Sequence, residues 1–165
     1  MPTVHFVCYG NICRSPFAEH YARKIADARG LTGWSFTSTG VGASPGAGTP
    51  KPGLAAAKSL DVDLTRHAAC HVEDRAPAAE DLVLAMDRYV FGQLAEHLGP
   101  TLSQVRGPNG STLRLMMQEV PDTQPADLDV PDPMGQGLAA YERSYDVLRV
   151  AVDNLVLRLL RDSNP

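Results

Sequence analysis

The stretch that decides the fold is Cys8-Tyr9-Gly10-Asn11-Ile12-Cys13-Arg14-Ser15-Pro16, which directly follows the apolar run Val4-His5-Phe6-Val7. An apolar run, a short loop and a proline predict a strand, a tight turn and the start of a helix. The first N–H groups of a helix lack intrahelical partners, and the helix dipole favours negative charge. The backbone between Cys8 and Arg14 is therefore expected to curve around one tetrahedral anion.

A cysteine at the bottom of such a loop is a candidate nucleophile. The pKa of a free thiol is about 8.5, and a helix N-terminus with a neighbouring cation lowers it. We expect Cys8 to attack phosphorus while the planar fork of Arg14 holds two phosphate oxygens. The predicted phosphate-binding residues are Tyr9, Gly10, Asn11, Ile12, Cys13 and Arg14. For an isolated cysteine, a buried core thiol at a strand end would be the simpler interpretation.

The loop also carries residues suited to a closed backbone. Asn11 enters left-handed conformations more easily than most residues, and Gly10 offers a second permissive position. Ser15 is expected to cap the following helix, with its hydroxyl also reaching the Cys8 sulfur, and Pro16 suits the first helical turn. Together these residues make the motif far more specific than a cysteine and an arginine at this spacing.

The string from Phe6 to Pro16 resembles the signature loop of the low-molecular-weight protein tyrosine phosphatases. That family also carries an Asp-Pro pair near its C-terminus, and Val130-Pro131-Asp132-Pro133 is similar to it. The resemblance spans nearly the whole chain and implies that Asp132 is the catalytic acid and that His67 buttresses the phosphate loop. Weaker matches are Ser38-Thr39-Gly40 and Ala85-Met86-Asp87.

Composition agrees with one α/β domain over residues 1–165. The net charge is −4 without a basic cluster, which argues against nucleic-acid binding. No apolar run approaches ~18 residues, so no membrane span is expected. Met1-Pro2-Thr3 leads straight into a predicted strand, so no signal peptide is expected. Three cysteines suit a reducing cytoplasm, although secretion without a signal peptide stays open.

Apolar periodicity predicts alternating strands and helices. Strands are expected at 3–7, 34–39, 81–86 and 112–117, and helices at 16–29, 54–60, 89–98 and from about 138 to 159. This alternation predicts a doubly wound sheet of four parallel strands, with ligands at their carboxyl ends. In the first helix, Phe17 and Tyr21 should face inward, whereas Glu19 and Arg23 should face solvent. Apolar residues recur every three or four positions along the last helix and form a stripe on it. This stripe could seed a coiled coil, but its width favours packing on the sheet.

The resemblance implies a two-step phosphatase reaction. Cys8 would form a cysteinyl-phosphate, and Asp132 would protonate the leaving phenolate and then activate water, releasing inorganic phosphate. A phosphorylated protein or peptide is the expected partner. No cofactor or metal is required, and the sequence shows no cluster with metal-ligand spacing. Asp132 could also be a simple turn former, like other Asp residues of the acidic loop.

Departures from the family pattern fall at the pocket mouth. Aromatic walls are missing after the Asp-Pro pair, where Met134 stands, and in the segment 42–46. Met134 and Tyr9 are therefore the expected walls, with weaker discrimination for an aryl group. Cys70 replaces an arginine that usually lies three residues after His67.

Several alternatives stay open, and the first two share this scaffold. A protein arginine phosphatase is ranked second, because that subgroup has threonine where this loop has Ile12. An arsenate reductase would need two further cysteines, and Cys70 alone lies outside the loop. A non-catalytic phosphate-binding module, or a phosphocysteine carrier, would not need the whole set of nucleophile, arginine and acid.

Cys13 has two interpretations. It could fill space beneath the loop as a small apolar side chain. Alternatively, it could form a reversible disulfide with Cys8 and protect the thiolate from over-oxidation, if the two Cα atoms lie about 4.4–6.8 Å apart.

Overall fold

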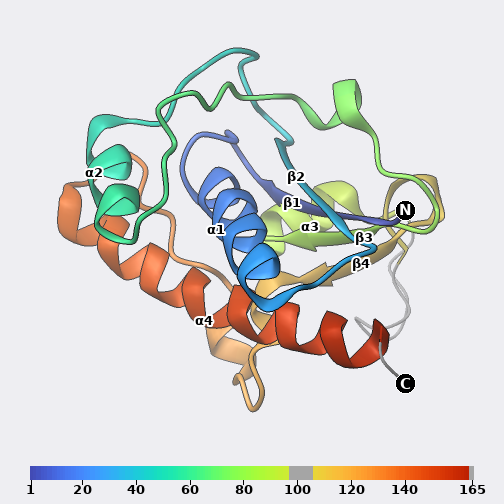
Figure 1. The fold of residues 1–165 in the computed structure, drawn as a ribbon. Coiled ribbons are helices and arrows are strands. Elements are labelled where there is room, and N and C mark those ends of the chain that lie inside the picture. The colour runs from blue at the N-terminus through green and yellow to red at the C-terminus, as the bar shows by residue number, and fades with distance from the viewer. Residues whose placement is uncertain (97–105, 164–165) are drawn as a thin grey trace.

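Four parallel strands form one sheet in the computed structural model, which describes residues 1–96 and 106–163 (Figure 1). The strands are β1 (Thr3–Cys8), β2 (Ser35–Gly40), β3 (Leu82–Ala85) and β4 (Thr112–Leu115). Their order is β2-β1-β3-β4. After β1, the chain first forms β2 on one side of this strand and later forms β3 and β4 on its other side. The predicted four-stranded parallel sheet is confirmed. Cys8 ends a central strand at the point where the strand order reverses, which is where open α/β sheets bind ligands.

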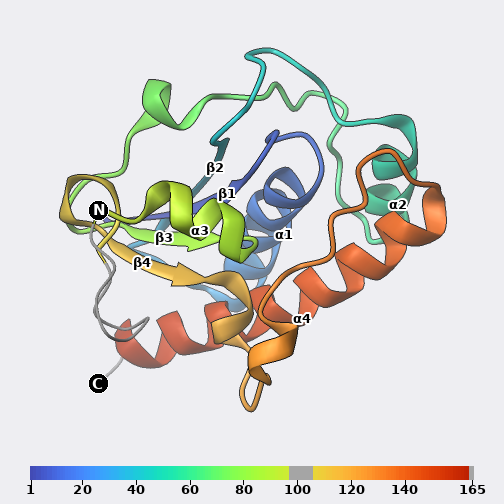
Figure 2. The same cartoon turned by 180° about the vertical axis from the view of Figure 1, so that it is seen from behind.

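Helices cover both faces of this sheet (Figures 1 and 2). They are α1 (Arg14–Arg29), α2 (Lys51–Ser59), α3 (Arg88–Leu94) and α4 (Leu138–Ser163). Figure 1 shows α1 and α4 in front of the sheet, and Figure 2 shows α3 on the opposite face. Short 3₁₀ turns lie at Val72–Arg75, Pro108–Gly110, Met116–Glu119 and Pro125–Asp127.

The apolar stripe of α4 packs inside the molecule. Tyr145 is fully buried, and its ring stacks on Phe17 of α1 with centroids 4.0 Å apart. Leu148, Val152 and Leu155 of the same stripe are also fully buried. A coiled-coil seam would leave these side chains for a second helix, so the stripe serves the core. A second core on the other face joins Val83, Val90, Phe91 and Leu113.

Several element boundaries differ from the sequence expectation. Helix α2 begins at Lys51, three residues earlier than expected, because Pro52 in a first turn loses no needed hydrogen bond. The fourth strand ends at Leu115 because the next residues turn into a 3₁₀ helix. Helix α3 ends at Leu94, and the rest of the expected helix partly lies outside the described residues.

Glu19 is a clear correction to the expected polar face of α1. It is 6% exposed, whereas the sequence placed it in solvent. Its carboxylate accepts a 2.5 Å hydrogen bond from Ser38 Oγ and pairs with Arg23 at 2.6 Å. A buried carboxylate needs such partners, and here β2 supplies one of them.

Over the described residues, no helix has the length and apolar character needed to cross a membrane.

Candidate active site

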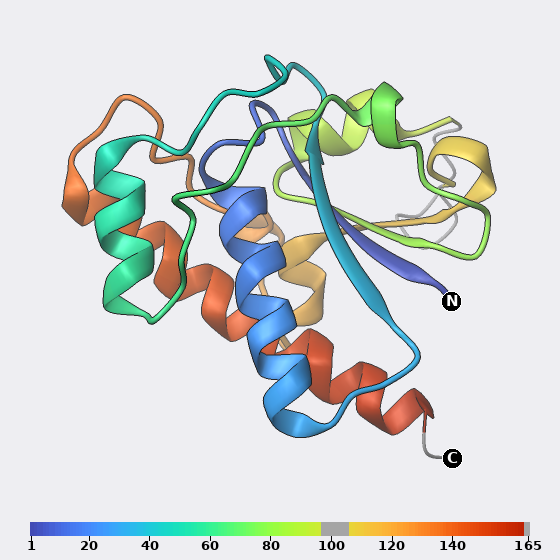
Figure 3. The same ribbon diagram turned by 45° about the horizontal axis from the view of Figure 1, so that its top comes forward.

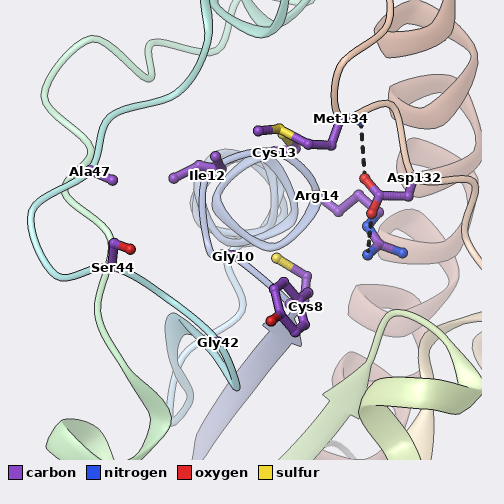
Figure 4. Close-up of a pocket in the computed structure, with 11 residues that line it drawn as sticks. Cys8, Gly10, Ile12, Cys13, Arg14, Gly42, Ser44, Ala47, Asp132 and Met134 are labelled. Carbon is purple, nitrogen blue, oxygen red and sulfur yellow. Dashed lines mark hydrogen bonds and ion pairs between the residues drawn. The ribbon is translucent and has the colours of Figure 1, made fainter.

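The loop between β1 and α1 holds Cys8 at its floor (Figure 4). The Cys8 side chain is 2% exposed, and its Sγ accepts a hydrogen bond from the Asn11 N–H at 3.2 Å. The hydroxyl of Ser15 lies 3.0 Å from the same sulfur. Hydrogen bonds donated to a sulfur favour its charged, nucleophilic form.

Asn11 is the residue that shapes this loop. Its backbone is left-handed with φ 52°, and its side chain is fully buried. The amide Nδ2 donates to Ser15 Oγ and Ser38 Oγ, each at 2.9 Å. Its Oδ1 accepts from the Cys70 N–H at 2.8 Å, and its carbonyl accepts from His67 Nε2 at 2.7 Å. The loop conformation is therefore built by neighbouring side chains.

Arg14 is buried at the side of the loop, 2% exposed. Its Nη1 lies 2.8 Å from Asp87 Oδ2 and donates to the Val130 carbonyl at 3.0 Å. Asp87 also accepts the Val90 N–H at 2.8 Å, which caps α3. Asp87 thus positions the guanidinium, a role that the sequence analysis did not assign. Its place directly after a buried strand, in the motif Ala85-Met86-Asp87, was the signal that could have revealed it.

Asp132 reaches the same pocket from the loop that precedes α4. Its Oδ2 lies 3.3 Å from Arg14 Nη2, and its Oδ1 accepts the Met134 N–H at 3.1 Å. The Asp132 side chain is 50% exposed, so water and a molecule in the pocket can reach its carboxyl group. Figure 4 shows Asp132 and Arg14 facing each other on one side of the loop that holds Cys8.

These groups border one cavity of about 270 Å³. Its lining residues are Cys8, Tyr9, Gly10, Ile12, Cys13, Arg14, Gly42, Ser44, Ala47, Asp132 and Met134. Asn11 does not line it, because its side chain turns into the protein. The phosphate contact predicted for Asn11 concerns its backbone N–H, which points to the Cys8 sulfur and stays a prediction. The wall across from Met134 consists of Gly42, Ser44 and Ala47 (Figure 4). The large apolar side chains of the lining are therefore Tyr9, Ile12 and Met134.

Tyr9 and Gly42 form the rim together. A Cβ built on Gly42 would lie 2.5 Å from Tyr9 Cζ, so the Tyr9 ring packs directly against the glycine backbone. Tyr9 is 52% exposed and tilts against Tyr89, with ring centroids 6.2 Å apart. Its exposed ring is therefore available to a bound substrate.

The profile described as "Low molecular weight phosphotyrosine protein phosphatase" matches residues 3–164. The chain belongs to this family. It is 30% identical over 159 residues to a probable low molecular weight protein-tyrosine-phosphatase, EpsP, of Ralstonia nicotianae, with 95% of each chain covered. It is 28% identical to a protein-arginine-phosphatase of Bacillus subtilis, with 95% of this chain and 96% of that relative covered. The crystal structure of YfkJ from Bacillus subtilis is similar, with a TM-score of 0.79, 26% identity, and 99% and 98% of the two chains covered.

Two expectations about the loop of this phosphatase are wrong. Helix α1 begins at Arg14, and its N-cap residue is Cys13 without a side-chain cap, so Ser15 does not cap the helix. The Ser15 hydroxyl instead lies between the Cys8 sulfur and the Thr39 carbonyl, to which it donates at 3.3 Å. Gly10 does not adopt a positive φ, because Asn11 alone makes the left-handed turn of this loop.

Cys13 lies against α4 in the phosphatase core. Its thiol is 3.3 Å from Tyr141 Oη and 3.9 Å from Met134 Sδ. Burial raises the pKa of Cys13 to about 11, which keeps this thiol protonated at neutral pH. The Cys13 carbonyl accepts a hydrogen bond from Tyr145 Oη at 3.1 Å. Cys8, Cys13 and Cys70 are all free thiols in this structure.

A cluster of metal-ligand side chains also appears beside the loop of the phosphatase. Glu19, His20 and His67 each place one potential ligand atom within 4.8 Å of the others. The sequence showed no such cluster, because His67 is remote along the chain and comes to α1 only through the fold.

Proposed function

We propose that this phosphatase hydrolyses phosphotyrosine in proteins or peptides, and small aryl phosphates, through a cysteinyl-phosphate on Cys8. One observation carries the proposal: the buried Cys8 sulfur, the Arg14 guanidinium and the Asp132 carboxyl border a single cavity. Each group supplies a different need of the reaction, namely a nucleophile, charge stabilisation and a proton.

In the first step, the Cys8 thiolate attacks phosphorus and the bond to the phenolic oxygen breaks. The attacking and leaving atoms lie in line, and charge spreads over three equatorial oxygens. The loop N–H groups and Arg14 hold these oxygens, while Asp132 gives its proton to the leaving phenolate. Tyrosine and a thiophosphate on Cys8 result, and no metal takes part in this step.

In the second step, water attacks the phosphorus of the intermediate. Asp132, now a carboxylate, takes a proton from this water, and the P–S bond breaks. Inorganic phosphate forms, and the sulfur returns as a thiolate. The Asn11 N–H, 3.2 Å from the sulfur, then stabilises the departing thiolate, and the Ser15 hydroxyl, 3.0 Å away, can turn from the Thr39 carbonyl to donate to it as well.

Protein arginine phosphatase activity is the second candidate. It is supported by the relative of that name in Bacillus subtilis and by the small wall residues Gly42, Ser44 and Ala47. Against it stands Ile12, because its alkyl group lines the cavity and suits an aryl ring better than a polar guanidino group. We therefore favour the aryl substrate.

A substrate panel tests this choice. Phosphotyrosine, phosphoserine and phosphoarginine peptides are compared with p-nitrophenyl phosphate under the same conditions. The proposal expects the highest kcat/KM among the peptides for phosphotyrosine. Preference for phosphoarginine would select the second candidate, and the absence of turnover for every substrate would leave a phosphate-binding module.

Two further properties belong to this proposal. Free Cys8 and Cys13 at one site support reversible oxidation, with Cys13 as the protecting thiol. Three unpaired cysteines also suit a reducing cytoplasm as the place of action.

A further inference from the structure

A second side-chain cluster lies behind the phosphate loop. Glu19 and His20 belong to α1, and His67 belongs to the segment that follows α2 and runs beside α1 (Figures 1 and 3). Glu19 is buried, whereas the two histidines are partly exposed. The His20 and His67 rings meet edge to face, with centroids 6.2 Å apart. An ion could therefore enter from the solvent side.

Hydrogen bonds already orient two of the side chains that would bind the ion. His67 Nε2 donates to the Asn11 carbonyl at 2.7 Å, so Nδ1 is the nitrogen of this ring that is left for an ion. Ser38 Oγ donates to Glu19 Oε2 and fixes the carboxylate plane. Metal-binding histidines and carboxylates are commonly held by such outer hydrogen bonds, which also set the histidine tautomer.

We propose that Glu19, His20 and His67 bind one divalent transition-metal ion of the zinc type. Two imidazoles and one carboxylate are a common ligand set for Zn²⁺, with water as a fourth ligand, and imidazole disfavours Mg²⁺ and Ca²⁺. Zn–N distances are about 2.0–2.1 Å, so two nitrogens that bind one ion lie at most about 4.2 Å apart. The ligand atoms of this cluster lie within 4.8 Å of one another, so they must move together by roughly an ångström when the ion binds. The partly exposed His20 side chain is the one free to make this movement.

Arg23 competes with the ion for Glu19. Its guanidinium lies 2.6 Å from Glu19 Oε1 and donates to the Phe36 carbonyl at 2.7 Å. The Arg23 side chain is 52% exposed, so it can swing into solvent when a cation takes its place. Removing this positive charge should therefore strengthen metal binding, the opposite of the effect of removing a ligand.

The site connects α1, the segment with His67, and the phosphate loop. An ion on His67 Nδ1 would hold this ring against the Asn11 carbonyl, which supports the left-handed turn of the loop. Binding to the folded state alone also raises its stability by mass action. The bound ion should therefore raise the unfolding temperature in proportion to its affinity.

The experiment uses the full chain with Cys8→Ser, because a thiolate would itself bind zinc. Zn²⁺ is titrated by calorimetry into this protein and into the same protein carrying His20→Ala, Arg23→Met or, as a control, His71→Ala. His71 is a partly exposed histidine outside the cluster. Long-range ¹H–¹⁵N spectra report which imidazole nitrogens bind Zn²⁺, and Co²⁺ absorption reports thiolate ligation. The result is independent of the proposed function, because this chain lacks the nucleophile.

We expect one Zn²⁺ per chain, shifts at nitrogens of His20 and His67, and no binding of Mg²⁺. Loss of outer-shell partners alone typically costs 10–100-fold in metal affinity, so His20→Ala should weaken binding by at least about tenfold. Arg23→Met should tighten it, and His71→Ala should not change it. No Zn²⁺ binding, unchanged affinity in His20→Ala, or a cobalt–thiolate absorption band would overturn the proposal.

Discussion

Arg14 and Asp87 form an ion pair of 2.8 Å between residues that lie 73 positions apart. The sheet brings them together, because β1 and β3 are neighbours in parallel register with Val7 opposite Ala85. The loops that follow β1 and β3 therefore meet at the same edge of the sheet. Asp87 holds the guanidinium beside the cavity and caps α3 at the same time. The geometry of the anion site thus depends on an acidic residue outside the phosphate loop.

Replacing Asp87 by asparagine should weaken catalysis without unfolding the protein. Asn keeps an oxygen for the Val90 N–H but removes the charge that orients Arg14. A hydrogen bond to a charged group is worth about 1.5–3 kcal/mol, so kcat/KM for a phosphotyrosine peptide should fall by about ten- to a hundredfold. Steady-state kinetics check this, with Asp129→Asn as control, since Asp129 pairs with Arg88 instead. Equal activity of Asp87→Asn and the parent would contradict the positioning role.

Asp132→Asn should slow the reaction in a way that depends on the leaving group. Removing a general acid typically costs about 10²–10⁴-fold. Nitrophenolate is a stable anion and needs little protonation, whereas the phenolate of tyrosine needs it strongly. Phosphorylation of Cys8 should therefore slow far more with a phosphotyrosine peptide than with p-nitrophenyl phosphate.

Single-turnover kinetics are needed for this comparison, because hydrolysis of the intermediate can hide the first step. The acidic limb of the pH profile should persist in Asp132→Asn, while the alkaline fall flattens. If both substrates slow equally, or neither does, Asp132 is not the acid.

Mild peroxide should inactivate the enzyme reversibly, and Cys13→Ala should make the loss harder to reverse. Burial raises the pKa of Cys13 to about 11, so the neutral Cys13 thiol does not compete with Cys8 for the oxidant. Once Cys8 becomes a sulfenic acid, the Cys13 thiol can condense with it to a disulfide and release water. Mass spectrometry of the oxidised protein should find Cys8 joined to Cys13. A bridge to Cys70, or over-oxidised Cys8 in the parent, would refute the protecting role.

Stability should fall as the pH drops below about 6.5, partly because of His5. This ring is 4% exposed, its Nε2 lies 3.0 Å from Asp81 Oδ2, and its Nδ1 has no hydrogen-bond partner among the described residues. Burial lowers the pKa of His5 and outweighs the attraction of Asp81. The unfolded chain therefore binds a proton at a pH where the folded chain does not, and the free energy of unfolding rises with pH in that window.

His5→Gln should flatten this dependence by at most ~1.4 kcal/mol per pH unit, the limit for one proton. Burial also lowers the pKa of His20, so some slope should persist. Urea unfolding between pH 5 and pH 8 measures the slope for both proteins. An unchanged slope in His5→Gln would show that His5 titrates normally in the folded state.

The sequence predicted the sheet because buried parallel strands and amphipathic helices have strong periodicity. Boundaries were less accurate where a turn decides them, as at Pro52 and after Leu115. The floor of the site was also predictable, because Cys8 and Arg14 lie in one short motif. The prediction for Asp132 depended on the family resemblance, since an Asp in a proline-rich loop has no pattern that marks it as an acid.

Residues that act through the fold escaped prediction. Asp87 meets Arg14 only because β1 and β3 are neighbours, and His67 meets Glu19 only because the segment after α2 returns along α1. Glu19 appeared as a solvent-facing helix residue, although Ser38 of β2 provides it with a buried partner. Sequence spacing carries no information about such long-range pairs.

Trapping the phosphoenzyme tests the central claim most directly. The protein is mixed with a phosphotyrosine peptide, quenched in acid within a single turnover, and digested for mass spectrometry. The mechanism predicts phosphate on the Cys8 sulfur, and Cys8→Ser should show no such thiophosphate and lose turnover while still binding inorganic phosphate. Phosphate found on another residue, no phosphoprotein during rapid turnover, or substantial activity in Cys8→Ser would contradict it.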